Sequence, residues 1–328
     1  MTLDIAIIGS NSFSGNAFEA HTLLSRDCLS VSRSTKLDNV FDAKNTETES
    51  HNPHIVWNLN ENSDFVIDAI RENGISTVVN FAAQSMVGES WNFPQDWYEA
   101  NVVSFAKFIN RLKNETNITK FIHFTTPEVY GSTDGWIKES FNFAPNTPYA
   151  ISRAAGDWHL RAMYENFDFP VIFTRAANVY GEHQQLYRIV PKVILSALTG
   201  KKLPLQGGGK SIRSFIHISD VNRALDKIIS KGHIGETYHI STNELITIHD
   251  LVALICGRLN VEFSDIVEIA PDRPGKDFAY QLDSSKIRSE LNWSDSISLT
   301  AGIDNTISWV KANLSELREM PTHYIHRK

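Results

Sequence analysis

The sequence is poor in cysteine, in excess positive charge and in long apolar runs. Its 328 residues hold two cysteines, Cys28 and Cys256, far apart and without metal-ligand spacing, so we expect reduced core residues and neither a disulfide framework nor a metal site. The net charge is −7 with both signs interspersed, which predicts no nucleic-acid surface. No apolar run is long enough to span a membrane.

What is present is enough apolar sequence for a large core. Hydrophobic residues make up 42% of the chain, sufficient for one large domain or two. A strand-like stretch, Asp4–Ile8, begins almost at once and leaves no room for a signal peptide. We therefore expect a cytoplasmic protein.

Alternating strand and helix patterns over residues 4–174 predict the fold class. They are typical of right-handed βαβ units and indicate an α/β protein with one Rossmann-type, doubly wound parallel sheet. The pattern changes at Glu182. We predict a dinucleotide-binding domain over 1–180 and a smaller α/β domain, mainly for substrate, over 181–328, with residues 211–232 returning to the first.

The first strand runs into a glycine turn between Gly9 and Gly15. Such a turn lets backbone N–H groups and a helix N-terminus approach a pyrophosphate. The spacing resembles the GxxGxxG of short-chain dehydrogenase/reductase folds, with Ser12 in place of the middle glycine. After a later strand, 77–81, the small residues Ala82 and Ala83 would let a nicotinamide ribose lie close.

The residues after the second strand, 28–32, bear on the choice of cofactor. An acid there would favour NAD by accepting hydrogen bonds from the adenosine ribose. Instead the sequence has Ser32, Arg33 and Ser34, where Arg33 can bond a 2′-phosphate with its guanidinium fork. We predict NADP as the cofactor, with NAD as the second choice.

Polar residues at the end of the strand 120–124 indicate the chemistry. Thr126 and Glu128 follow it at the carboxyl edge of the sheet, where open α/β folds bind ligands. Tyr149 and Arg153 are four apart and share a helix face, and a cation beside a phenol favours the phenolate, a base for an alcohol proton. An ordinary strand end and a helical Tyr–Arg pair explain this stretch alone equally well.

Further along, two arginines suggest a diphosphate clamp. Arg213 lies on a predicted strand, 211–218, and Arg273 in a proline-fixed loop, where both guanidinium groups can bond phosphate. Asp220 is expected to cap the helix that follows. In the predicted helix 97–113, a buried Asn101 needs partners, and strand-end backbone would supply them.

Five motifs in this order carry a resemblance to a known family. They are Thr125–Gly131, Pro148–Arg153, Arg175–Gly181, Arg213–His217 with Asp220, and Asp272–Asp277 leading to Lys286–Trp293. Through them the chain, from Gly9 to about Trp293, resembles the extended short-chain dehydrogenase/reductase family of nucleotide-sugar enzymes, and within it the nucleoside-diphosphate-sugar 4,6-dehydratases. The stretch 82–87 is also similar to GDP-mannose and CDP-glucose dehydratases.

The resemblance implies a redox-neutral reaction on a nucleoside-diphosphate sugar. Tyr149 takes the proton of the sugar 4-hydroxyl while the cofactor takes hydride from C4, and Thr126 bonds the same oxygen. Glu128 removes the C5 proton as water leaves C6, and hydride returns to C6. Family precedent places Asn178, among others, on the diphosphate and suggests a homodimer through helices near 97–113 and 150–165.

Three departures from the family pattern keep other activities open. Arg153 occupies the usual lysine position, Pro127 stands where dehydratases often have an aspartate or serine, and Ser12 replaces a glycine. The alternatives are a nucleotide-sugar epimerase, an NDP-uronate decarboxylase and a catalytically inactive, cofactor-binding regulatory protein. The joint presence of Thr126, Glu128 and Tyr149 argues against the last.

The complete prediction of the site is as follows. The catalytic residues are Thr126, Glu128, Tyr149 and Arg153. The cofactor-binding residues are Gly9, Asn11, Ser12, Phe13, Ser14, Gly15, Ser32, Arg33, Ser34, Asn58, Leu59, Phe81, Ala82, Ala83, Asn101, Thr125, Tyr149 and Arg153. The substrate-binding residues are Gln84, Ser85, Asn178, Arg188, Arg213 and Arg273. No motif identifies the nucleotide base or the sugar.

Overall fold

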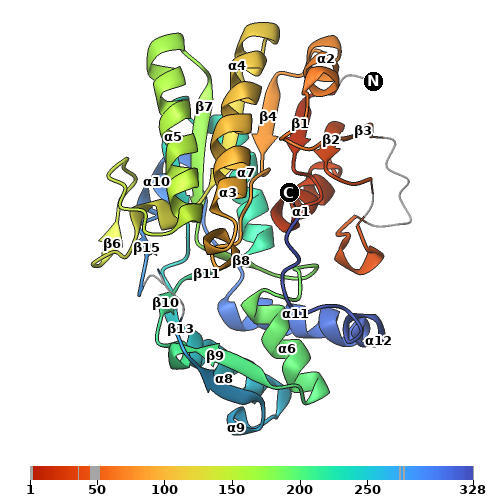
Figure 1. The fold of residues 1–328 in the computed structure, drawn as a ribbon, viewed down its shortest axis with the longest axis vertical. Coiled ribbons are helices and arrows are strands. Elements are labelled where there is room, and N and C mark those ends of the chain that lie inside the picture. Colours follow the sequence, from red (N-terminus) through yellow and green to blue (C-terminus); the bar gives the residue numbers. More distant parts are fainter. Residues whose placement is uncertain (1–2, 36, 45–51, 273–274, 276–277, 328) are drawn as a thin grey trace.

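A parallel sheet forms the core of the larger of two lobes in the computed structural model, which describes residues 3–35, 37–44, 52–272, 275 and 278–327 (Figure 1). Within these residues, seven strands take the order β12-β7-β5-β4-β1-β2-β3, a Rossmann-type arrangement whose halves diverge between β1 and β4. The predicted fold class is confirmed. The strands are β1 (Ile5–Ile8), β2 (Cys28–Ser32), β3 (His54–Val56), β4 (Thr77–Asn80), β5 (Lys120–Thr125), β7 (Val171–Ala176) and β12 (Thr237–Ile240).

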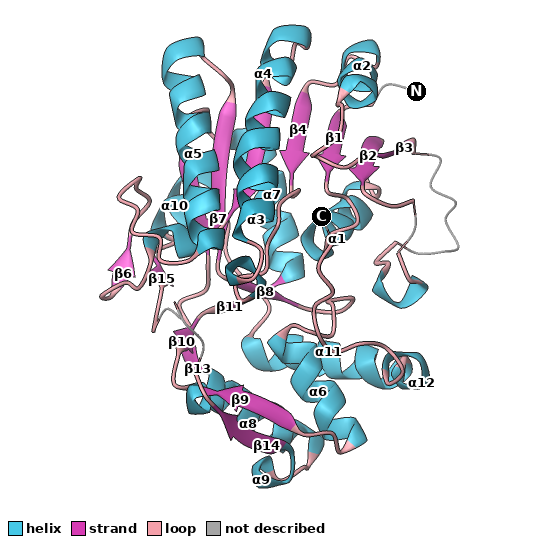
Figure 2. Cartoon of the chain, viewed as in Figure 1, coloured by secondary structure: helices cyan, strands magenta, loops and turns pink. Residues whose placement is uncertain are grey.

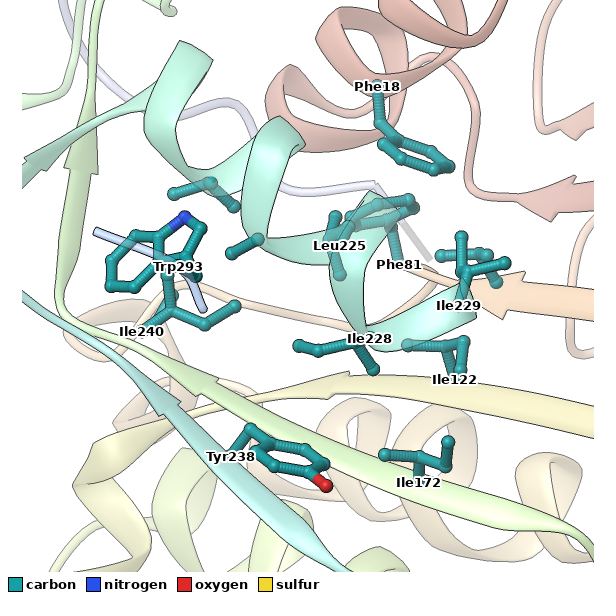
Figure 3. Packing of buried hydrophobic residues seen from close by; sticks show 14 of the residues in the cluster. Phe18, Phe81, Ile122, Ile172, Leu225, Ile228, Ile229, Tyr238, Ile240 and Trp293 are labelled. Atoms are coloured by element: carbon teal, nitrogen blue, oxygen red, sulfur yellow. The ribbon is translucent and has the colours of Figure 1, made fainter. Parts of the chain in front are cut away.

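Helices cover both faces of this sheet because alternate strand residues point to opposite sides. In β1, Ile5 and Ile7 belong to one apolar cluster and Ala6 and Ile8 to the other. Figure 3 shows part of the first cluster, with Phe18, Leu225 and Trp293 from the covering helices and chain. The first face carries α1 (Phe13–Thr22), α7 (Ile218–Lys231) and α10 (Ser285–Leu291), and the second α2 (Asp64–Glu72), α3 (Pro94–Tyr98), α4 (Phe105–Glu115) and α5 (Pro148–Phe167).

The smaller lobe has its own apolar cluster below the carboxyl edge of the sheet (Figure 2). It contains α6 (Ile189–Thr199), β9 (Leu203–Gln206), α8 (Ile248–Leu259), α9 (Phe263–Ile266), β14 (Val267–Ala270), α11 (Leu299–Ala312) and α12 (Leu314–Leu317). Short strand pairs join the lobes: β8 (Asn178–Tyr180) with β11 (Phe215–His217), β10 (Ile212–Arg213) with β13 (Ile246–Thr247), and β6 (Trp136–Ile137) with β15 (Gln281–Leu282). The 3₁₀ turns are η1 (Asn39–Phe41), η2 (Glu89–Trp91), η4 (Pro127–Tyr130) and η5 (Gly207–Gly209).

Three local predictions need correction. The helix predicted over 97–113 is interrupted by a π-helical turn, η3 (Glu99–Ser104), between α3 and α4. The strand predicted over 211–218 divides at Ser214 into β10 and β11. Asp220 does not cap α7. The ring of His217 accepts the capping bond from the Ser219 N–H. The Asp220 carboxylate instead accepts backbone N–H bonds from Ser296 and Ile297, because it lies inside the first turn of α7 and faces that loop.

Both cysteines are buried and free, and burial raises the pKa of the Cys28 thiol to about 12. Among the described residues, no helix has the length and apolar character required to cross a membrane.

Candidate active site

Close packing and hydrogen bonds within the protein fix the shape of the glycine turn after β1. Gly9 has a φ of +85°, and a Cβ there would lie 2.7 Å from the backbone nitrogen of Ala82, so this position requires glycine. The Ser12 hydroxyl donates to the Gly9 carbonyl over 2.7 Å and accepts from the Gly15 N–H over 3.1 Å. Ser12 therefore serves as the N-cap of α1, and the N–H groups of Phe13 and Ser14 begin the helix beside the turn.

The loop after β2 is bonded to the glycine turn. The Asn11 amide donates to the carbonyl of Ser34 over 2.6 Å and to its hydroxyl over 3.1 Å. The Ser32 hydroxyl is buried and donates to the same Ser34 carbonyl. Arg33 is exposed, and its Nη1 donates to the carbonyl of Arg327 over 3.1 Å. The predicted selectivity residues thus stand together beside the turn.

The segment after β4 is held in place by Asn101 from the π-helical turn. The Asn101 side chain accepts from the Gln84 N–H over 2.8 Å and donates to the Gln84 carbonyl and the Ser152 hydroxyl, both over 2.9 Å. The Asn101 amide thus makes the predicted bonds to strand-end backbone, and its partners are protein groups rather than a cofactor. A π turn widens a helix locally, a feature frequent at functional sites. The turn fixes where Ala82 and Ala83 lie.

Other residues predicted to bind cofactor or substrate lie away from the centre of the site. The Phe81 ring packs in the core between Phe18 and Phe124, with ring centroids 5.8 and 5.1 Å away, so only its backbone can line the site. Asn58 follows β3 in a turn, where its side chain accepts from the N–H of the exposed Asn60. Leu59 lines a surface cavity of about 240 Å³, and Ser85 is exposed.

The predicted catalytic side chains meet where β5 and α5 approach each other. Thr126 accepts from the Glu128 N–H over 3.2 Å and so starts the turn η4. Thr147 caps α5 with Pro148 in its first turn, which places Tyr149 at the helix start. The Thr126 hydroxyl and the charges of Glu128 and Arg153 all lie close enough to the Tyr149 phenol to shift its pKa.

Opposing effects set the acidity of this phenol. Burial raises the pKa of Tyr149 above its ordinary value, and the negative charge of Glu128 adds to the rise. Arg153, the Thr126 hydroxyl and Arg188 all lower the pKa of Tyr149, with Arg153 the strongest of these. The predicted effect of Arg153 is present, but burial outweighs it.

Arg153 extends from α5 over a buried polar network. Its Nη2 donates to the Phe124 carbonyl over 2.6 Å and lies 3.4 Å from Nε2 of His123. The same His123 nitrogen is 3.4 Å from Asp157, which pairs with Arg175 over 2.8 Å. Burial lowers the pKa of His123 to about 4, so the ring is neutral at neutral pH. The network connects α5 to β5 and β7 below the site.

Two of the predicted diphosphate residues, Asn178 and Arg213, contact the same aromatic side chain, Tyr280, which the sequence analysis did not single out. The Tyr280 hydroxyl donates to the side-chain oxygen of Asn178, and the Arg213 guanidinium lies 4.4 Å from the centre of the Tyr280 ring. Arg188 stands at the N-terminus of α6, its guanidinium 5.5 Å from the Tyr187 ring. Arg273 lies outside the described residues. No local motif marks Tyr280, because its role depends on contacts about a hundred residues away.

The chain's own groups fit a nicotinamide dinucleotide. The glycine turn leads directly into the N-terminus of α1, where backbone N–H groups and the helix dipole favour a pyrophosphate. Two buried polar atoms at the carboxyl edge, Oγ1 of Thr125 and Nε of Arg153, have no hydrogen-bond partner within the described part of the chain. Buried polar groups need partners, and a bound ligand would supply them.

Comparisons with known proteins agree with this geometry. The family model described as GDP-mannose 4,6-dehydratase matches residues 8–306. A dTDP-glucose 4,6-dehydratase of Xanthomonas campestris is 31% identical over 262 residues, 74% of this chain and 75% of that protein. A trifunctional UDP-glucose 4,6-dehydratase, epimerase and reductase of Arabidopsis thaliana is 30% identical over 85% of this chain, which spans 42% of the plant protein.

Solved structures give the same answer. A double mutant of a dTDP-glucose 4,6-dehydratase from Streptomyces venezuelae, crystallised with NAD, has a TM-score of 0.89 and 26% identity, covering 95% of this chain and 98% of that one. The enzyme of Bacillus anthracis in complex with NAD has a TM-score of 0.85 and 28% identity, covering 96% and 98%. The resemblance found in the sequence is confirmed: the chain belongs to the GDP-mannose 4,6-dehydratase family.

Proposed function

We propose that this protein is a nucleoside-diphosphate-sugar 4,6-dehydratase. The observation that carries the proposal is the meeting of Thr126, Glu128 and Tyr149 at the carboxyl edge of the sheet, beside a glycine turn. The relatives named as 4,6-dehydratases support it. We further propose that residues 1–180 hold the dinucleotide and 181–328 mainly the nucleotide sugar, with 211–232 returning to the first domain.

The chemistry follows from what each side chain can do. When bound, the dinucleotide supplies hydride acceptance from C4 and hydride return to C6. Tyr149, as phenolate, takes the proton of the 4-hydroxyl, and Thr126 bonds the same oxygen. The resulting 4-ketone acidifies the C5 proton, and Glu128 removes it as water leaves C6. Asn178 and Arg213, which both contact Tyr280, are the residues that we expect to bind the diphosphate.

Pro127 favours one competing activity. It is buried at the start of η4, where it has no proton to give to a departing 6-hydroxyl. A 4-epimerase oxidises C4 and returns the hydride to the opposite face of the same carbon; no hydroxyl leaves, so it has no use for such a donor. In the proposed dehydratase, Glu128 or water must protonate the leaving group.

The test is incubation with a panel of NDP-hexoses, followed by mass spectrometry of the products. A dehydratase yields a 4-keto-6-deoxy sugar, lighter by one water. Products of unchanged mass would replace the proposal by epimerisation, and release of carbon dioxide from an NDP-uronate would replace it by decarboxylation. If the protein binds the dinucleotide but converts none of the sugars, the regulatory alternative is favoured.

Activity should rise with pH because Tyr149 acts as a phenolate. Its pKa is raised, so the phenol is protonated at neutral pH, and below that pKa the phenolate fraction grows about tenfold per pH unit. Arg153→Gln removes the strongest opposing charge and should move the rise in kcat/KM to higher pH. Arg153→Lys keeps the charge and should leave the profile near that of the wild type. A Gln variant with an unshifted profile would contradict this role of Arg153.

The cofactor is a nicotinamide dinucleotide, and we propose NADP ahead of NAD on the basis of Arg33. The two solved relatives described above hold NAD, so selectivity in this chain has to be measured. Arg33→Ala should weaken binding of NADP⁺ at least about tenfold more than binding of NAD⁺, because it removes a charge-assisted bond to the 2′-phosphate that only NADP⁺ carries. Calorimetric titration of both dinucleotides checks this. Equal weakening of the two would remove the basis for NADP.

A homodimer is proposed through the helices that the sequence analysis indicated. Exposed apolar residues lie on η3 and α5, which pack side by side: Val103, Ile151 and Trp158, the last with 51% of its surface exposed. Trp158→Glu should convert a dimer to a monomer, observed as halved mass in light scattering. Phe65→Glu, at an equally apolar but remote position on α2, should leave the mass unchanged. A wild-type monomer would refute the proposal.

A further inference from the structure

The segment 321–327 runs from the smaller lobe to the carboxyl edge of the sheet (Figure 1). At its far end, the carbonyl of Arg327 accepts two side-chain bonds. One comes from Nη1 of Arg33 over 3.1 Å, the other from Nε2 of Gln84 over 2.7 Å. One peptide group thus joins the loop after β2 to the loop after β4.

This bridge spans the glycine turn. In the sheet, β1 lies between β2 and β4, with Ile8 opposite Val31 on one side and Asn80 on the other. The turn that starts at Gly9 is therefore flanked by the two loops that Arg327 connects. A group bound at that turn would lie below the bridge, since parallel strands bring their carboxyl ends to one edge.

The middle of the segment contacts both lobes. The Tyr324 hydroxyl donates to Oε1 of Gln84 over 3.3 Å, and its ring meets the Tyr187 ring edge-on at 5.3 Å. Tyr187 immediately precedes Arg188, the N-cap residue of α6. The segment therefore crosses between the part of the site proposed for the dinucleotide and the part proposed for the nucleotide sugar.

His326 anchors the segment. Its Nε2 lies 2.8 Å from the Asp96 carboxylate, and its ring stacks on Phe93 at 4.7 Å and Trp97 at 5.2 Å. Both members of the His326–Asp96 pair are largely shielded, with 15% and 12% of their side chains exposed. By contrast, His323 in the same segment is exposed. His326 is therefore shielded by two aromatic rings, whereas its neighbours His323 and Ile325 are exposed.

We propose that residues 321–327 form a releasable strap that closes over the dinucleotide cleft and slows escape of the cofactor. The inference rests on the dinucleotide site of the proposed function. In a cycle that regenerates its cofactor at every turnover, slow release does not limit the rate, so a strap over the cleft is compatible with activity. Because its contacts are few, local opening at low free-energy cost lets cofactor exchange.

The test compares cofactor dissociation in His326→Ala, His323→Ala and wild type. Protein loaded with NADPH or NADH is mixed with an excess of the oxidised dinucleotide, and loss of nicotinamide fluorescence gives the dissociation rate. His326→Ala should release the dinucleotide about tenfold faster, the loss expected for one shielded hydrogen bond with ring stacking. His323→Ala should match the wild type, and a chain ending at Met320 should release at least as fast as His326→Ala.

The outcomes separate the strap from the site it covers. If all variants bind the dinucleotide and release it at equal rates, the strap proposal is overturned and the proposed function stands. Slower dissociation or tighter binding after removal of the segment also overturns it, since the segment would then compete for the cofactor's place. Absence of any NAD(H) or NADP(H) binding by the full chain overturns both proposals together.

Discussion

Glu128→Gln should lower the rate of dehydration by about 10²- to 10⁴-fold while leaving oxidation at C4 nearly intact, the range expected on losing a general base. The two steps use different groups: Tyr149 acts on the 4-hydroxyl, and Glu128 on the C5 proton. Gln keeps the shape of the side chain but cannot take a proton. Removing the negative charge also relieves its upward effect on the pKa of Tyr149, which favours the phenolate.

Two measurements on the same sample separate the steps. Incorporation of deuterium at C5 from deuterium oxide reports on Glu128, and the absorbance of reduced nicotinamide reports on oxidation at C4. The Glu128→Gln variant should lose deuterium incorporation at C5 and accumulate reduced nicotinamide. Glu316→Gln, at an exposed position on α12, is the matched control and should behave as wild type. Equal loss of both signals would contradict the division of roles between Glu128 and Tyr149.

The sheet was predictable because its signals are local. Buried parallel strands read as short apolar runs, and the predicted strand 28–32 coincides with β2. The grouping of the proposed catalytic residues was predictable for a related reason. Thr126 and Glu128 follow one strand and Tyr149 begins one helix, and parallel topology brings both to the same edge.

The remaining features depend on contacts between distant parts of the chain. A π turn leaves no mark in the apolar pattern, yet it positions Asn101 on the backbone of Gln84. Tyr280 reaches Asn178 across a separation of 102 residues, and Arg327 reaches Arg33 across nearly the whole sequence. Asp220 looked like a helix cap because a single sequence shows which residues can cap, but not which loop the carboxylate will face.

Asp157→Asn should lower the free energy of unfolding by about 3–5 kcal/mol, the loss typical of removing one partner from a buried ion pair. Asp157 and Arg175 are both fully buried and 2.8 Å apart. Burial pushes the pKa of Asp157 upward, but Arg175 and then His123 bring it below its ordinary value, so the carboxylate is charged. Asn would leave the Arg175 cation without a counter-ion, 5.2 Å from the Tyr130 ring.

The matched control is Asp304→Asn, which removes the same charge from an exposed pair with Arg258, 2.7 Å apart. A surface pair contributes less than about 1 kcal/mol, so urea unfolding of this variant should stay close to wild type. Equal losses in the free energy of unfolding of the two variants would contradict the claim that burial makes the Asp157–Arg175 pair the more important one. Because Asp157 lies on α5 with Tyr149 and Arg153, while Arg175 lies on β7, the pair also fixes the helix that carries the proposed base. Asp157→Asn should therefore lose activity at urea concentrations too low to unfold it, and Asp304→Asn should not.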